Sequence, residues 1–184
     1  MIFRDEKNPL DAAQVVNVIK KFCEDVPTQA VSFTGGEPLL HWQFVRDVAE
    51  VVKNFGVKIF LETNGTLCNA FEKISDVVDI VSMDIKLGQN LFNLHEKFLR
   101  AAHEKDLCVK IVVTGETTAE EFFSAVELIA GVNAEIFLIL QPVTPIKNIK
   151  AVSAEKILSF QAAALRKIKN VRVIPQTHKF INLL

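Results

Sequence analysis

Hydrophobic and polar residues are distributed along the chain in two kinds of segment, short apolar runs and longer runs of helical period. The short runs are nearly continuous in apolarity and rich in Val, Ile and Phe. Such runs are typical of strands in a parallel sheet, where both faces of each strand are buried. The sequence therefore predicts strands at 30–34, 57–62, 80–84, 108–113, 135–140 and 171–174.

The segments between the predicted strands each carry one apolar stripe with helical spacing. The stripes lie at 15–22, 45–55, 91–102, 122–129 and 157–168, and a shorter helix is predicted at 71–75. In the first stripe, Val15, Val18, Ile19 and Phe22 are expected to share one buried face. Helix starts are predicted at the capping residues Asp11, Thr118 and Ser153.

Strands alternating with helices indicate right-handed crossovers and a parallel sheet, either open or curved into a barrel. The chain has no internal linker, charge block or low-complexity segment, so residues 1–184 are predicted to form a single α/β domain. The predicted order of elements begins with a helix, without the strand that would normally precede it in such an alternation.

Composition excludes several functional classes. The chain is 49% hydrophobic and 23% charged, with a net charge of −1. It has no stripe of basic residues interleaved with aromatic residues, so we expect no nucleic-acid partner. No apolar run reaches membrane-spanning length, and the charged start from Arg4 is not typical of a signal peptide. We therefore expect a cytoplasmic protein with no membrane partner. Cys23, Cys68 and Cys108 are far apart, so they predict neither a disulfide framework nor a metal site.

Unusual residues collect in the predicted strand-to-helix loops. These loops are TGGEP at 34–38, ETNGT at 62–66, SMDIKLGQN at 82–90, TGET at 114–117 and QPVTPIKNIK at 141–150. Because the carboxyl ends of parallel strands meet at one face, the loops predict a ligand site there. The predicted helix-to-strand connections, at the other end of the sheet, are short and contain no comparable group of unusual residues.

The chemistry of these loops favours an amino-acid-like ligand. Gly35 and Gly36 let the backbone approach a ligand closely, and Glu37 would repel a phosphate but pair with an ammonium group. The alternative interpretation of the glycines is a tight turn. Asp84 and Lys86 alternate along a strand end and so point to one side, although a local ion pair also accounts for them.

The chain has four histidines, and their positions predict different roles. His41, His95 and His103 lie in helical segments with no acid or cysteine at a ligand spacing, and we interpret them as surface or packing residues. His178 follows the last predicted strand on the face where the loops collect, and it is the histidine we expect in a site.

The stretch TGGEPLL at 34–40 resembles the second signature of the radical S-adenosylmethionine enzymes. Together with LETNGT at 61–66, VDIVSMDIKL at 78–87, LQPVT at 140–144 and VRVIPQTHKF at 171–180, it resembles the 7-carboxy-7-deazaguanine synthases over nearly the whole chain. The implied fold is the incomplete parallel (β/α) barrel of that superfamily, without its first strand. The implied S-adenosylmethionine ligands are Thr34, Gly35, Gly36, Glu37, Glu62, Asn64, Ser82, Asp84, Lys86 and Gln141.

The resemblance also implies a reaction. The small-molecule substrate would be a carboxytetrahydropterin contacted by His178, and its ring would contract with loss of ammonia on the route to queuosine and archaeosine. A 4Fe–4S cluster and Mg²⁺ accompany this chemistry. The cluster motif C-x-x-x-C-x-x-C is expected upstream of Met1, so the chain as given is expected to be inactive, and no metal ligand is assigned.

Two other functions remain open from the residues. GGEP also fits activases of glycyl-radical enzymes or of anaerobic ribonucleotide reductase, whereas the PQTHKF tail favours the synthase. A non-enzymatic module that binds S-adenosylmethionine or a nucleoside is the third possibility. An exposed barrel edge would also favour a homodimer.

Overall fold

The computed structural model describes residues 10–145 and 149–180 of the chain. Within these ranges, strands form one parallel sheet in the order β1-β2-β3-β4-β5-β6. The strands are β1 (Ala30–Phe33), β2 (Lys58–Thr63), β3 (Ile80–Ile85), β4 (Asp106–Val113), β5 (Phe137–Pro142) and β6 (Val171–Val173). All six predicted strands are confirmed, with ends that differ by no more than two residues.

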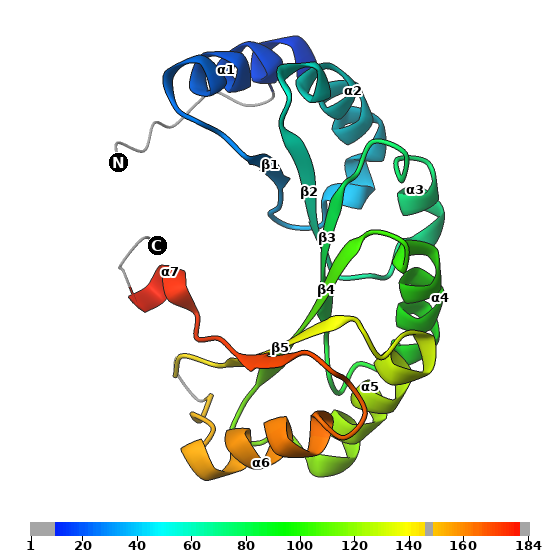
Figure 1. Cartoon of the computed structure of the whole chain (residues 1–184), viewed down its shortest axis with the longest axis vertical. Helices are drawn as coiled ribbons and strands as arrows, with labels where there is room; N and C mark the ends of the chain where they lie inside the picture. Colours follow the sequence, from blue (N-terminus) through cyan, green and yellow to red (C-terminus); the bar gives the residue numbers. More distant parts are fainter. Residues whose placement is uncertain (1–9, 146–148, 181–184) are drawn as a thin grey trace.

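Helices connect the strands. They are α1 (Ala12–Asp25), α2 (Trp42–Val52), α3 (Cys68–Glu72), α4 (Phe92–Ala102), α5 (Ala119–Val132), α6 (Ala154–Ala164) and α7 (Thr177–Phe180), with 3-10 turns η1 (Pro38–His41) and η2 (Lys53–Phe55). The predicted caps are confirmed: Asp11 and Thr118 form capping boxes, and Ser153 accepts the N–H of Lys156. The helices from α1 to α6 line the outer side of a curved sheet (Figure 1).

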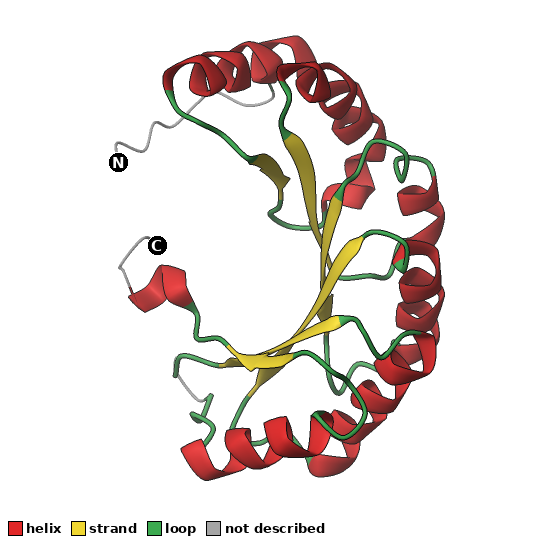
Figure 2. Cartoon of the chain, in the orientation of Figure 1, coloured by secondary structure: helices red, strands yellow, loops and turns green. Residues whose placement is uncertain are grey.

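The sheet is open. Its edge strands β1 and β6 lie at opposite ends of a crescent, and among the described residues the concave side carries no layer of long helices (Figure 2). The core lies between the sheet and the outer helices, where Leu61, Met83 and Leu138 from the strands pack with Phe98 and Phe122 from the helices. The resulting shape is the predicted incomplete parallel barrel.

Burial alternates along β2, β4 and most of β5, which corrects one prediction. In β4, every second residue from Leu107 to Val113 is buried, whereas the residues between them are partly exposed. The expectation that both faces of each strand are buried is therefore wrong. Apolarity on the second face reflects a concave surface that the outer helices do not cover.

The first helix also differs from expectation. Val15 and Ile19 pack against the core as predicted, but Val18 and Phe22 are 51% and 65% exposed. Because α1 packs chiefly against α2 at the end of the sheet, only a narrow stripe of it is covered. Across residues 10–145 and 149–180, no helix has the length and apolarity needed to span a membrane.

Candidate functional site

The concave face of the sheet collects the polar residues that the sequence singles out. Parallel register pairs Glu62 with Ser82, and it pairs Ser82 with Cys108 on the next strand. Side chains of paired residues point to the same face of a sheet. Thr63, which follows Glu62, is 5% exposed and lies on the opposite, helix-covered face. Glu62 and Ser82 therefore lie on the concave face.

A small cavity of about 170 Å³ lies where β1, β2 and β3 end. Its lining is Thr34, Gly35, Gly36, Glu62, Thr63, Asn64, Asp84 and Lys86. All but Thr63 are predicted cofactor ligands, so the fold brings together residues from three separate loops. Ser82 lies deeper along β3, and Gln141 lies on β5, away from this lining.

The two glycines give this cavity a bare wall. Gly35 and Gly36 have φ values of +84° and +53°, which side chains rarely adopt. A Cβ atom built on either residue would meet no heavy atom within 4 Å. The space in front of both backbones is therefore open to a ligand, and the same positive φ values also fit a tight turn.

The carboxylate of Glu37, which was expected to pair with an ammonium group of a ligand, forms hydrogen bonds within the protein. Its Oε1 accepts hydrogen bonds from the N–H of Leu39 at 3.1 Å and from Thr63 Oγ1 at 2.8 Å, while Oε2 accepts from the N–H of Asn64 at 2.8 Å. The carboxylate thus caps η1 and ties the glycine loop to the end of β2. It does not line the 170 Å³ cavity, but it lines a neighbouring cavity of about 350 Å³ together with Gly35 and Gly36.

Asp84 lies between two lysines. Its Oδ1 is 2.9 Å from Lys110 Nζ, and its Oδ2 is 3.7 Å from Lys86 Nζ. The local Asp84–Lys86 pair is present, but the closer partner is Lys110 on β4, which sequence reasoning missed. Register pairs Asp84 directly with Lys110, so the order of the strands was needed to find this contact.

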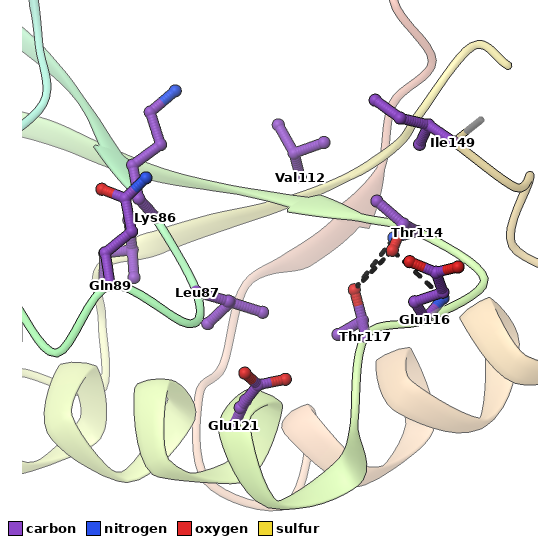
Figure 3. A pocket seen from close by; sticks show the side chains of 10 residues that line it. Lys86, Leu87, Gln89, Val112, Thr114, Glu116, Thr117, Glu121 and Ile149 are labelled. Carbon is purple, nitrogen blue, oxygen red and sulfur yellow. Dashed lines mark hydrogen bonds between the residues drawn. The ribbon is translucent and has the colours of Figure 1, made fainter. Parts of the chain in front are cut away.

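A second, larger cavity of about 530 Å³ lies at the carboxyl ends of β3 and β4 and shares Lys86 with the first. Its lining also includes Leu87, Gln89, Val112, Thr114, Glu116, Thr117, Glu121 and Ile149. Figure 3 shows Glu121 pointing from α5 toward the loop that carries Lys86 and Gln89, with Thr114 bonded to Thr117 beside it. Hydrogen bonds from Thr118 lower the pKa of Glu121.

The four histidines differ in how exposed their side chains are. His41 and His103 are exposed, as expected of surface residues, and His95 is fully buried. His178 belongs to α7, which follows β6, but its side chain is outside the described residues. Of the four, His95 is the unusual one, because a buried imidazole normally has a partner.

The sequence profile of the radical SAM superfamily matches residues 2–144, and the chain belongs to this superfamily. Among solved structures, Streptococcus suis SuiB bound to S-adenosylmethionine has a similar fold, with a TM-score of 0.65 and 12% identity over 94% of this chain and 45% of that one. Superfamily membership implies S-adenosylmethionine and a 4Fe–4S cluster as cofactors.

Curated relatives define the branch of the superfamily. The 7-carboxy-7-deazaguanine synthase of Geobacter sulfurreducens is 36% identical and is matched over 96% of this chain and 73% of its own length. That of Methanocaldococcus jannaschii is 31% identical, over 95% of this chain and 75% of its own length. The chain is therefore a radical SAM protein of the 7-carboxy-7-deazaguanine synthase family.

The two implied cofactors fit the described residues unequally. The open glycine backbones beside Asp84 and Lys86 suit the amino-acid part of S-adenosylmethionine. The cysteines do not suit a cluster, because Cys23 is on α1, Cys68 begins α3 and Cys108 is on β4. Between residues 10–145 and 149–180, no group of three His, Cys, Asp or Glu side chains could hold a metal.

Proposed function

We propose that this chain forms the S-adenosylmethionine-binding half-barrel of a lyase that converts 6-carboxy-5,6,7,8-tetrahydropterin to 7-carboxy-7-deazaguanine. The observation that carries the proposal is the cavity in which Gly35 and Gly36 leave their backbones open beside an acid and a lysine. Family membership supports the reaction, since the curated relatives are synthases of that product.

The small cavity suits the methionine part of the cofactor. Backbone groups of Thr34, Gly35 and Gly36 can bond the amino group, with Glu62 or Asp84 supplying negative charge. Lys86 is exposed and only 3.7 Å from Asp84, so its ammonium can turn to a carboxylate. Glu37 acts by holding the loop, because three hydrogen bonds already engage its oxygens.

The larger cavity suits the nucleoside part. Leu87, Val112 and Ile149 offer apolar surface for a planar base, while Gln89 and Thr114 offer hydrogen-bonding groups at its rim. Lys86 lines both cavities, and we propose that one extended ligand spans the two.

The remaining predicted residues are assigned to the reaction on the concave face. Ser82 and Gln141 are proposed to contact the cofactor from β3 and β5, and His178 is proposed to contact the substrate. S-adenosylmethionine, when bound, would supply the radical chemistry of this superfamily. The protein residues bind and orient both molecules.

A second candidate function is binding of S-adenosylmethionine or a nucleoside without radical chemistry. The observation that favours it is the separation of Cys23, Cys68 and Cys108 on different elements. This function predicts the same cavities but no bound cluster, so cofactor binding and iron content together distinguish the two.

Calorimetry with S-adenosylhomocysteine tests the proposed site without requiring a cluster. We expect saturable binding that Lys86→Ala weakens by about tenfold or more, the loss expected for one charge-assisted hydrogen bond. Lys58→Ala is the matched control, since Lys58 is an exposed lysine at the amino end of β2, the end of the strand opposite the cavity. Absence of binding, or equal effects of the two variants, would exclude this site for the cofactor.

A further inference from the structure

Lys110 is a largely buried cation next to the cofactor cavity, and no role has yet been assigned to it. It lies on β4, and its register partner is Asp84 on β3, so its side chain is on the concave face. That side chain is 20% exposed, whereas the side chain of Lys86 is 47% exposed. Lysines are seldom withdrawn from water to this extent unless they are paired, so the partner of Lys110 indicates its role.

The two lysines beside Asp84 are unequal partners. Lys110 Nζ is 2.9 Å from Asp84 Oδ1, whereas Lys86 Nζ is 3.7 Å from Asp84 Oδ2. Coulomb attraction falls with distance, and water screens the more exposed lysine more strongly. Lys110 is therefore the main counter-ion of Asp84, and the pair with Lys86 is of the exposed kind that contributes little.

The same two lysines also differ in where they lie. Lys86 lines both the 170 Å³ and the 530 Å³ cavities, whereas Lys110 belongs to neither lining. Lys110 reaches Asp84 from the neighbouring strand β4. The charge of Asp84 is thus balanced by a lysine outside the two cavities, and the lysine within them remains able to pair with a ligand.

The charges of the small cavity explain why this division matters. Its lining contains two acids, Glu62 and Asp84, and one lysine, Lys86. The amino-acid part of S-adenosylmethionine carries an ammonium and a carboxylate, so it needs a cation as well as an acid. If Lys86 were held by Asp84, the lining would offer the ligand carboxylate no free cation. With Lys110 on Asp84, Lys86 can take that carboxylate.

We propose that Lys110 is a positioning residue that neutralises Asp84 and so releases Lys86 to bind the carboxylate of the ligand. Lys110 thereby determines how strongly the site prefers a ligand that has an amino-acid part. The identity of that ligand rests on the proposed function, whereas the choice of Lys110 as the main partner of Asp84 does not.

The test uses variants that separate the charge of Lys110 from its bulk. Lys110→Met keeps an unbranched apolar side chain and removes the charge, while Lys110→Arg keeps the charge. Lys53→Met is the matched control, because Lys53 Nζ is also 2.9 Å from an aspartate, Asp79. Asp79 directly precedes β3, at the end of the strand opposite the cavities.

Calorimetry with two ligands is the first readout. S-adenosylhomocysteine has the amino-acid part, and 5′-methylthioadenosine has the same nucleoside and thioether without it. We expect Lys110→Met to raise the Kd for S-adenosylhomocysteine by about three- to tenfold and that for 5′-methylthioadenosine by less than about twofold. Lys110→Arg should recover at least part of this loss. Equal losses for the two ligands, or an equal loss in Lys53→Met, would overturn the proposal.

A double-mutant cycle with Lys86→Ala is the second readout. If Lys110 acts by releasing Lys86, then Lys110→Met should change the Kd for S-adenosylhomocysteine by less than about twofold once Lys86 is alanine. Effects of the two substitutions that multiply independently would show that Lys110 does not act through Lys86, and would refute the positioning role.

The mobility of the Lys86 side chain in ligand-free protein is the third readout. We expect the order parameter of Lys86 Cε, from ¹³C relaxation, to rise in Lys110→Met, because Lys86 then pairs with Asp84, and to stay unchanged in Lys53→Met. If wild-type protein binds no S-adenosylhomocysteine, the proposed function fails, and this measurement alone decides the role of Lys110. An order parameter that Lys110→Met leaves unchanged would refute that role.

Discussion

Gly65→Ala tests the packing of the Asn64–Gly65 turn. Gly65 is buried with a φ of +67°, and a Cβ atom there would be 2.3 Å from Met83 Cε and 2.8 Å from Met83 Cγ. Met83 is itself 0% exposed, so its side chain has little space to move away. The substitution therefore imposes two separate costs, one on the backbone and one on the core.

The magnitudes of both costs follow from the structure. An alanine held at positive φ costs about 1–2 kcal/mol, and crowding a packed core by one methyl group costs about 1–3 kcal/mol. We expect Gly65→Ala to lower the free energy of unfolding by about 2–5 kcal/mol, the sum of the two costs. For a chain of this length the corresponding fall in Tm is about 4–20 °C.

Alanine substitutions at two other glycines allow the backbone cost and the packing cost to be measured separately. Gly56 has a φ of +76° with no heavy atom near its Cβ position, so Gly56→Ala has only the backbone cost of about 1 kcal/mol. Gly131 lies in α5 in open space at ordinary φ, so Gly131→Ala should stabilise the protein by about 0.5 kcal/mol. Urea unfolding gives all three values. Equal destabilisation by Gly65→Ala and Gly56→Ala would refute the argument from Met83.

Two further predictions concern acid stability and metal content. Burial would raise the pKa of Asp79, but hydrogen bonds from the Ile59 N–H and Lys53 outweigh it and hold the pKa below its ordinary 3.8. The resulting stability is present above pH 3.8 and is lost as pH falls further, so Asp79→Asn should cost about 1 kcal/mol at pH 7 and less near pH 3, measured by urea unfolding. The 184-residue chain, reconstituted anaerobically with iron and sulfide, should carry no 4Fe–4S cluster; stoichiometric iron with visible absorption would contradict the placement of its cysteines.

The sequence was sufficient to predict the strands, the helix caps and much of the cavity lining. Continuous Val- and Ile-rich runs and the capping pairs at Asp11 and Thr118 depend on short-range physics, and the structure retains them. Loops after parallel strands must meet at one end of a sheet, so Thr34, Glu62, Asn64 and Lys86 could be expected together.

Tertiary structure decided which partner each polar group has. Glu37 bonds Thr63 and Asn64, and Asp84 bonds Lys110, because strand order and register bring together residues that are distant in the chain. His95 is indistinguishable in sequence from an exposed helical histidine such as His103, since only the packing of its helix in the fold buries it. Local patterns determine elements and their faces, whereas the contacts between faces depend on the whole fold.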